Sequence, residues 1–120
     1  MEQANGIEIA SENSVSVLSF KDSSITNSEK IAEMAEKIVQ YLSDKQPDYF
    51  IFDFKGVRFF SSQMLGLLLQ ARDMLNRIGG TILVSSIDPQ LYRVFKITNL
   101  NTIFKFYPDK KSAIESIKGR

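Results

Sequence analysis

Hydrophobic and polar residues alternate along two short stretches near the N-terminus of the chain. Residues 7–9 alternate in this way, residues 11–14 supply turn formers, and residues 15–20 resume the alternation. Strict alternation is typical of a strand with one buried face, so this segment predicts an antiparallel hairpin. Later runs that are almost continuously apolar are typical of strands buried on both faces. These runs cover residues 49–54, 81–84 and 103–106.

Between these strands, apolar residues recur at steps of three and four, the period of an amphipathic helix. One such segment follows Thr26, which together with Glu29 fits a capping box and is expected to cap the helix. A longer segment begins at about Ser62 and ends at Gly79-Gly80, a helix-stop signal. The residues predicted to face the core are Ile31, Met34, Ala35, Ile38 and Leu42 in the first helix, and Met64, Leu67, Leu68, Ala71, Met74, Leu75 and Ile78 in the second.

Two further helices are predicted in the last third of the chain. Asp88 is expected to cap one of them, with Pro89 at its first helical position, and this helix should end near Asn99. Pro108-Asp109 should begin a terminal helix. The residues expected to face inward are Leu91, Val94 and Phe95 in one helix, and Ala113, Ile114 and Ile117 in the other.

The predicted order of elements is ββαβαβαβα, in a single α/β domain that spans residues 1–120. Strands that alternate with helices form a mainly parallel sheet with right-handed crossovers. The hairpin would add an antiparallel edge. The sequence therefore predicts a mixed sheet with helices packed on it.

The composition excludes several classes of function. Lys and Arg number 15 against 14 for Asp and Glu, so no net charge favours DNA or anionic lipid as a partner. No apolar run approaches the length of a membrane span, and residues 1–6 lack a signal-peptide pattern. We therefore expect a cytoplasmic protein with no membrane insertion. A mild basic cluster near the C-terminus is expected to be solvated helix surface, and it consists of Lys110, Lys111, Lys118 and Arg120.

The chain contains neither His nor Cys, which removes the commonest general base and the commonest soft metal ligands. No metal site and no cofactor are predicted. A hydrolase with Ser62 as nucleophile would need a lysine or a carboxylate as its base. Lys55 is the one lysine near the turn in sequence, and it is expected to be solvated. Asp53 is expected to end its strand or to bond local backbone amides, so we expect no enzymatic turnover.

The stretch Phe59-Phe60-Ser61-Ser62-Gln63-Met64-Leu65-Gly66 joins a predicted buried strand to a predicted helix. It presents the hydroxyls of Ser61 and Ser62 at the edge where open α/β folds carry functional groups. A helix N-terminus favours negative charge, so a phosphate on either serine would be tolerated there. The alternative is that these serines only cap the helix. Leu65 and Leu69 either lie at the margin of the core or form an apolar patch that contacts a partner.

From residue 49 onward, this order of residues resembles a STAS domain, the fold of bacterial anti-sigma factor antagonists. The resemblance covers nearly the whole chain. It is carried by the strand Phe50–Phe54 with Gly56-Val57, the turn and helix that end in Gly79-Gly80, and Asp88-Pro89 through Leu100 and Phe104. The resemblance implies a regulatory binding module rather than an enzyme.

The family typically reads Asp-Ser-Ser-Gly-Leu-Gly at the strand-to-helix turn. Aligning Leu65-Gly66 with the end of this pattern puts Ser61 at the Asp position. Ser62 then falls at the first Ser, which is the phosphoacceptor in such antagonists. Gln63 replaces the second Ser and Met64 replaces the first Gly. Because Gly at this position would let another backbone approach closely, the resemblance implies that Met64 narrows that backbone contact.

The resemblance implies a partner switch. The unphosphorylated domain would bind an anti-sigma factor that is also a serine kinase, and phosphorylation would release it until a metal-dependent serine phosphatase restores the hydroxyl. The expected phosphorylation site is Ser62, with Ser61 as the alternative if the register is shifted by one. An unphosphorylated STAS scaffold or transport-associated module is the alternative function. The expected partner-binding residues are Thr26, Asn27, Ser61, Ser62, Gln63, Leu65 and Leu69.

Overall fold

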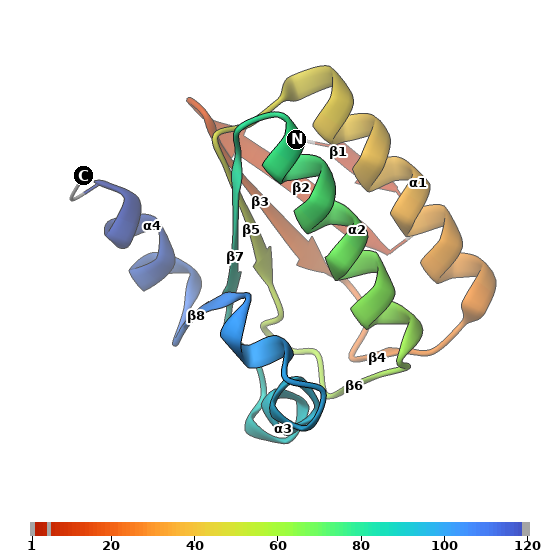
Figure 1. Cartoon of the computed structure of the whole chain (residues 1–120). Helices are drawn as coiled ribbons and strands as arrows, with labels where there is room; N and C mark the ends of the chain where they lie inside the picture. The colour runs from red at the N-terminus through yellow and green to blue at the C-terminus, as the bar shows by residue number, and fades with distance from the viewer. Residues whose placement is uncertain (1, 5, 119–120) are drawn as a thin grey trace.

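One mixed sheet organises the part of the chain that the structure describes, residues 2–4 and 6–118 of a computed structural model (Figure 1). Its strands, in spatial order, are β1 (Glu2–Ala4), β2 (Ile7–Glu12), β3 (Val15–Phe20), β5 (Tyr49–Asp53), β7 (Thr81–Ser85) and β8 (Lys105–Tyr107). The pairs β1–β2 and β2–β3 are antiparallel, whereas the pairs β3–β5, β5–β7 and β7–β8 are parallel. The predicted mainly parallel sheet with an antiparallel hairpin is confirmed, but β1, which the sequence did not predict, pairs with β2 and forms the outer edge.

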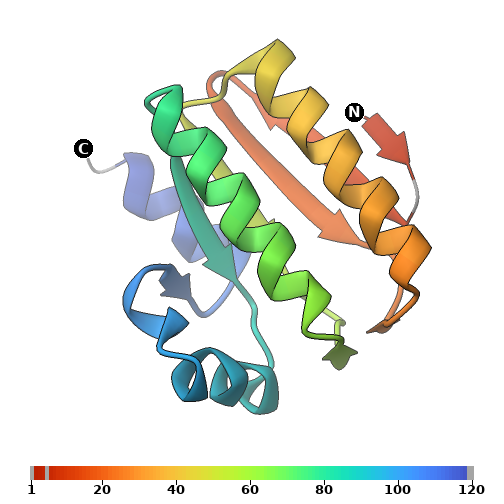
Figure 2. The ribbon, with the colours of Figure 1, turned by 45° about the vertical axis from the view of Figure 1, so that its right-hand side comes forward.

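Two long helices, α1 (Ser28–Lys45) and α2 (Gln63–Arg77), lie side by side over one face of this sheet (Figure 2). The short helix α3 (Pro89–Ile97) packs at the carboxyl end of the parallel strands, and α4 (Lys110–Lys118) lies on the opposite face. Most of the residues predicted to face the core from α1 and α2 are buried, and Ala35, Met74 and Ile78 are partly buried against them. The helical periodicity therefore identified the correct faces.

Alternation along β5 divides its side chains between the two faces of the sheet. Phe50 and Phe52 point toward α1 and α2, and Phe54 continues this row just beyond the strand. Ile51 points the other way and packs with Ala113 of α4. The Phe50 and Phe52 ring centroids lie 5.1 Å apart in an edge-to-face arrangement, so the aromatic run forms the centre of the larger core.

The loop between α2 and β7 depends on two adjacent glycines. Gly79 has φ +82°, the left-handed conformation that commonly ends a helix. A Cβ atom on Gly80 would lie 2.7 Å from the Pro47 carbonyl oxygen and 2.8 Å from Leu75 Cδ2. The pair therefore ends the helix as predicted, and its second glycine also allows α2 to pack closely against the loop that leads into β5.

Three sequence predictions of element boundaries need correction. The N-cap of α1 is Asn27 rather than Thr26, because the Asn27 Oδ1 atom accepts a 2.9 Å hydrogen bond from the Lys30 amide. The last strand begins at residue 105 rather than 103, because a 3₁₀ turn at Leu100–Thr102 follows the left-handed Asn99. The hairpin turn is shorter than predicted, since β2 continues through residue 12.

The cap and terminal helix predicted further along the chain are present. The Asp88 Oδ1 atom accepts a hydrogen bond from the Gln90 amide, and Pro89 occupies the first turn of α3. The three lysines of the basic cluster are exposed on α4, and Arg120 lies outside the described residues. No helix among the described residues is long and apolar enough to cross a bilayer.

Candidate functional site

A two-stranded ribbon that the sequence did not predict builds the candidate site. β4 (Ser24–Ile25) pairs in parallel with β6 (Phe59–Phe60), away from the main sheet. The pairing continues past the strands, because the Ser61 amide donates a 3.0 Å hydrogen bond to the Ile25 carbonyl. As a result, the loop that carries Thr26 and the turn that carries Ser61 lie side by side.

Two aromatic contacts hold the chain just before the serine pair. The Phe60 ring lies 5.7 Å from that of Phe54 and 6.2 Å from that of Phe95, both measured between centroids. Phe60 therefore points into the core from β6. The serines that follow start from a segment held by packing on two sides.

The side chain of Gln63 links the first turns of the two long helices. Its Nε2 atom donates a 3.1 Å hydrogen bond to the carbonyl oxygen of Ser28 at the start of α1. The N-terminal ends of α1 and α2 are thereby held at the same edge of the molecule. The side chains of Asn27, Ser62 and Gln63 are exposed at this edge, so three of the predicted partner-binding residues share one surface.

Neither serine caps α2 through its side chain. Ser62 is the N-cap residue and is exposed, but its side chain makes no capping hydrogen bond. The Ser61 Oγ atom is buried and has no hydrogen-bond partner. Ser62 therefore occupies the predicted N-cap position without a capping bond from its side chain, and it presents a hydroxyl that makes no hydrogen bond within the fold.

Three apolar residues of α2 differ in what they offer to a partner. Met64 is fully buried in the core, as its place in the helical stripe predicts, so its side chain is not part of the exposed surface. Leu65 is only 8% exposed and presents little of its side chain. Leu69 is half-buried against the core and keeps an exposed edge.

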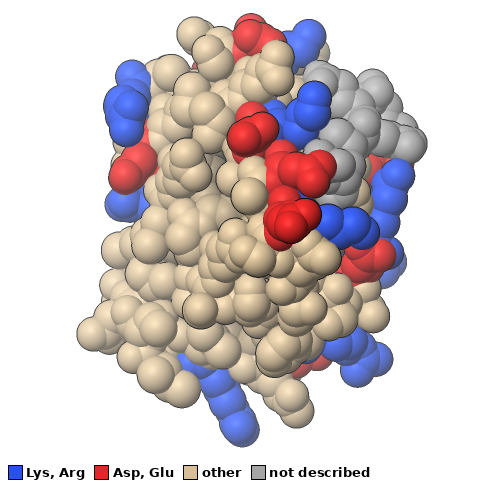
Figure 3. All heavy atoms as spheres, turned by 90° about the vertical axis from the view of Figure 1, so that its right-hand side faces the viewer, with Lys and Arg blue, Asp and Glu red and all other residues tan. Residues whose placement is uncertain are grey.

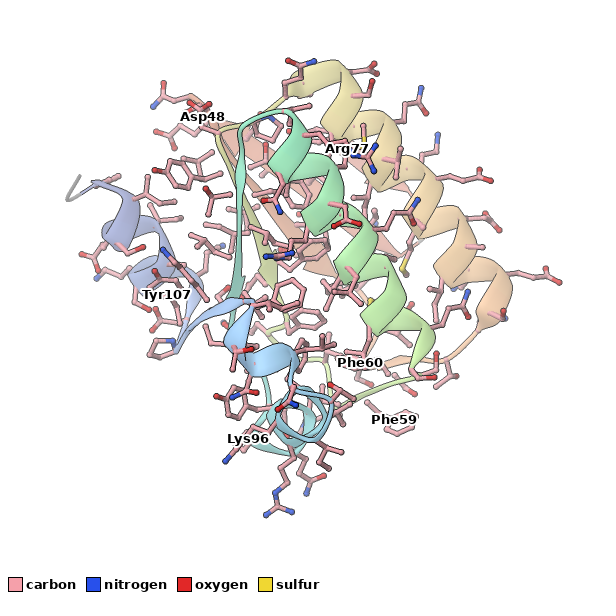
Figure 4. All side chains as sticks on the ribbon, in the orientation of Figure 1. Asp48, Phe59, Phe60, Arg77, Lys96 and Tyr107 are labelled. Carbon is pink, nitrogen blue, oxygen red and sulfur yellow. The ribbon has the colours of Figure 1, made fainter. Side chains whose placement is uncertain are left out.

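Phe59 is a surface residue that the sequence analysis did not assign to the site. Its side chain is 56% exposed, because alternation along β6 turns it away from the core that Phe60 enters. Figure 4 shows the two rings on either side of this short strand. The available signal was the pair of adjacent phenylalanines, since in an extended segment one of two neighbours must face outward.

The segments that form this surface carry no charge themselves, although the exposed residues Asp22, Glu29, Lys30 and Arg58 border them. Residues 23–28 and 59–71 contain no Asp, Glu, Lys or Arg. Figure 3 shows few charged side chains at the height of the N-terminal ends of α1 and α2. Nearby, Lys30 and Asp22 lie 3.9 Å apart as an exposed ion pair. A phosphate at Ser62 would therefore add the first charge within these uncharged segments, beside the positive end of the α2 dipole.

The described residues show no catalytic arrangement around Ser62. No lysine or carboxylate among them hydrogen-bonds to its hydroxyl. Asp53 ends β5, as expected, but its Oδ1 atom accepts a 2.8 Å hydrogen bond from Ser85 Oγ rather than from backbone amides. Among residues 2–4 and 6–118, no group of three acidic side chains could hold a metal ion.

Comparison with known proteins gives a family match over most of the chain. The model of the STAS domain matches residues 7–113. An anti-sigma F factor antagonist from Paenibacillus polymyxa is 23% identical over 74 residues, which is 62% of this chain. The match covers 63% of that relative, so the chain aligns with somewhat less than two thirds of its length.

Solved structures share the fold at low sequence identity. A STAS domain protein from Planctomyces limnophilus, described as an anti-sigma factor antagonist, gives a TM-score of 0.84 at 22% identity, over 93% of this chain and 97% of its own. The antagonist SpoIIAA gives 0.76 at 16% identity in its unphosphorylated form, over 95% of this chain and 99% of its own. The phosphorylated form of SpoIIAA from Bacillus gives a TM-score of 0.72 at 17% identity, over 92% of this chain and 98% of its own. These likenesses extend across the sheet and its helices.

Proposed function

This chain belongs to the STAS domain family, and we propose that it is an anti-sigma factor antagonist that works by partner switching through Ser62. The observation that carries the proposal is the exposed Ser62 hydroxyl, which starts α2 without capping it. Support also comes from the relatives, which are described as anti-sigma factor antagonists and include one structure in a phosphorylated form. The protein acts by binding, not by catalysis.

The proposed chemistry takes place on the partner kinase. That kinase transfers the γ-phosphoryl group of ATP to Ser62 Oγ, the serine proton goes to a base of the kinase, and ADP leaves. A serine phosphatase reverses the step by adding water across the phosphoester, which returns the hydroxyl and releases inorganic phosphate. The antagonist supplies only a rigidly positioned hydroxyl.

The phosphate acts as a switch because of where it is placed. It adds about −1.5 to −2 units of charge and three acceptor oxygens. The α2 N-terminus favours an anion, so the fold stays intact. In a contact shaped for a neutral surface, however, the same charge is desolvated without a partner, which weakens binding.

The proposed contact surface surrounds Ser62. Asn27 and Thr26 flank it on the ribbon side, Gln63 lies beside it, and Leu69 extends the surface along α2. We add Phe59, because exposed aromatic residues at the centre of a contact commonly carry much of its binding energy. Leu65 contributes mainly to the core beneath this surface.

The test begins with capture of binding partners from the native host, using the purified chain as bait. Recovery of a serine kinase of the anti-sigma type is expected. The captured kinase is then incubated with ATP and the chain, and intact-mass and fragment analysis should place one phosphate on Ser62. Ser62→Ala should bind the kinase and resist release, and Ser62→Asp should bind more weakly. Ser43→Asp, which adds the same charge to an exposed serine at the far end of α1, is the matched control and should bind normally.

Three results would contradict the proposal. One is the absence of phosphate on either serine when the kinase is shown to be active. Another is a phosphate on Ser61, which would move the switch to the neighbouring residue. The third is recovery of only transporter subunits or other STAS chains, which would support the scaffold function instead.

A further inference from the structure

A groove on the face of the sheet opposite α1 and α2 has no part in the proposed switch. It lies between α4 and the outer side of the β2–β3 hairpin and encloses about 550 Å³. α4 contacts β5, β7 and β8 on this face of the sheet (Figure 2). The groove is the space between that helix and the hairpin edge.

Side-chain alternation gives the groove an apolar floor. Val15 and Val17 of β3 share one face with Ala10 of β2, which stands opposite Val17 in the ladder. Ile114 and Ile117 complete the floor from α4. The valines and isoleucines are half-buried in the small core around Ile51, so they keep part of their surface open to the groove.

The two walls of the groove carry opposite charges. Glu8 and Glu12 flank Ala10 on β2, two residues to either side, and therefore share its face. Lys110 and Lys118 line the opposite side from the two ends of α4. An acidic wall thus faces a basic wall across an apolar floor.

The dimensions of the groove match a short helix. β2 spans six residues, about 20 Å at roughly 3.3 Å per residue, and α4 spans nine residues, about 14 Å at 1.5 Å per residue. A helix of about fourteen residues, nearly four turns, is about 21 Å long and covers the longer of these two lengths. We propose that the groove binds an amphipathic helix of another protein, with Lys or Arg along one flank and Asp or Glu along the other.

The charges and shape of the groove favour this occupant over others. An anionic membrane surface would meet the two glutamates as well as the lysines. A second copy of the same face would set one concave surface against another, which leaves the floor unfilled. An amphipathic helix presents a convex apolar stripe to the floor and places each charged flank against the opposite wall.

The test uses three synthetic helical peptides of about fourteen residues that share one apolar stripe and are stapled to hold the helix. The bipolar peptide has one lysine flank and one glutamate flank, and the other two have both flanks basic or both acidic. Because a helix can enter the groove in either direction, the comparison is between bipolar and single-sign flanks. In low salt, the bipolar peptide should bind roughly tenfold tighter than either control, with amide shifts confined to β2, β3 and α4.

Variants of the chain make the test specific. Glu12→Lys should weaken binding of the bipolar peptide and strengthen binding of the all-acidic peptide. Val17→Asp should abolish binding of all three peptides. Ile117→Ser should weaken their binding from the α4 side of the groove, without a change in the sheet itself. Gln40→Asp, at an exposed position of α1 on the opposite side, is the control and should change nothing.

The proposal is overturned if no peptide binds at about 1 mM, or if the bipolar peptide binds no tighter than the others. It is also overturned if light scattering shows a dimer that Ile117→Ser disperses, which would assign the groove to a second copy. Partition onto anionic vesicles that Val17→Asp prevents would assign it to a membrane surface. None of these outcomes depends on whether Ser62 is phosphorylated.

Discussion

Replacing Ser61 by alanine should make the protein more stable, although it removes a polar group from the candidate site. The Ser61 Oγ atom is buried and has no hydrogen-bond partner, even though the backbone amide of the same residue is paired with the Ile25 carbonyl. A hydroxyl in this position has lost its bonds to water and gained none in return. Alanine keeps the Cβ atom and removes only the oxygen.

The size of the effect follows from the cost of an unpaired buried group, which is about 1–3 kcal/mol in proteins. Because Ser61 as a residue is half-buried rather than fully enclosed, we expect the lower part of this range. Ser61→Ala should therefore raise the free energy of unfolding by about 1 kcal/mol. For a domain of this size, that corresponds to a rise in Tm of about 4 °C.

Ser85→Ala provides a matched control with the opposite sign. Its Oγ atom is also buried, but it donates a 2.8 Å hydrogen bond to the carboxyl group of Asp53, which is itself only 5% exposed. Removing this donor leaves a buried carboxyl oxygen unpaired. The free energy of unfolding should fall by about 1–3 kcal/mol.

The measurement is urea unfolding followed by circular dichroism for the wild type and both alanine variants, with a check that the slopes agree. The reasoning is refuted if Ser61→Ala lowers stability, or if the two variants shift it in the same direction. A loss for Ser61→Ala would show that its hydroxyl is already paired in solution, and a gain for Ser85→Ala would show that its hydrogen bond to Asp53 does not stabilise the fold. A gain for Ser61→Ala would mean that a buried hydroxyl next to the proposed contact surface is kept at a cost to the fold, as is common at functional sites.

Three further predictions test the local structure around the site and the helices. Gly80→Ala should lower the free energy of unfolding by more than about 2 kcal/mol, because its Cβ atom would lie 2.7 Å from a backbone carbonyl oxygen. Gly66→Ala inside α2 places its Cβ atom where nothing lies within 4 Å and should raise that free energy by up to about 1 kcal/mol. Urea unfolding measures both variants, and equal effects would contradict the close packing at Gly80. Asn27→Ala should lower the free energy of unfolding by about 1 kcal/mol because it removes the α1 cap, and Thr26→Ala should lower it by less than about 0.5 kcal/mol. If thermal melts show the larger loss for Thr26→Ala, Thr26 rather than Asn27 is the cap. The backbone amide of Ser112, and after it the Ser112 side chain, donate hydrogen bonds that hold the pKa of Asp109 below the ordinary aspartate value of about 3.9. The contribution of Asp109 to stability is therefore present above that pH and is lost as the pH falls through the lowered pKa. A carboxyl NMR titration that finds an ordinary or raised pKa for Asp109 would contradict this.

Local pattern was sufficient for most of the fold. Alternation and apolar runs located the hairpin and the buried strands, and the three-to-four spacing identified the buried faces of α1 and α2. Asp88-Pro89, the glycine pair and Asn99 marked helix boundaries correctly. These features succeed because capping, positive φ and amphipathic periodicity involve residues within a few positions of one another.

The details of the site depended on contacts between distant parts of the chain. Thr26 and Asn27 are both good capping residues, and the pairing of β4 with β6 decides where the chain turns into α1. The same pairing carries this loop to Ser61, a residue more than thirty positions away in sequence. Periodicity placed Met64 in the core correctly, but it could not tell whether Leu65 belongs to the core or to a partner contact.

By itself, the sequence determined the helices α1 to α4 and the strands β2, β3, β5, β7 and β8 of the main sheet, the apolar faces of the helices, and that a serine pair lies between a buried strand and a helix, but not the short strands β1, β4 and β6. The tertiary structure decided that Ser62 is exposed and uncapped, that Ser61 is unpaired, and that Phe59 faces outward beside them. It also decided that α4 leaves a charged groove along the hairpin. The physical reason is that burial and pairing are properties of two surfaces brought together, and the strand pairings that bring them together join segments far apart in the chain.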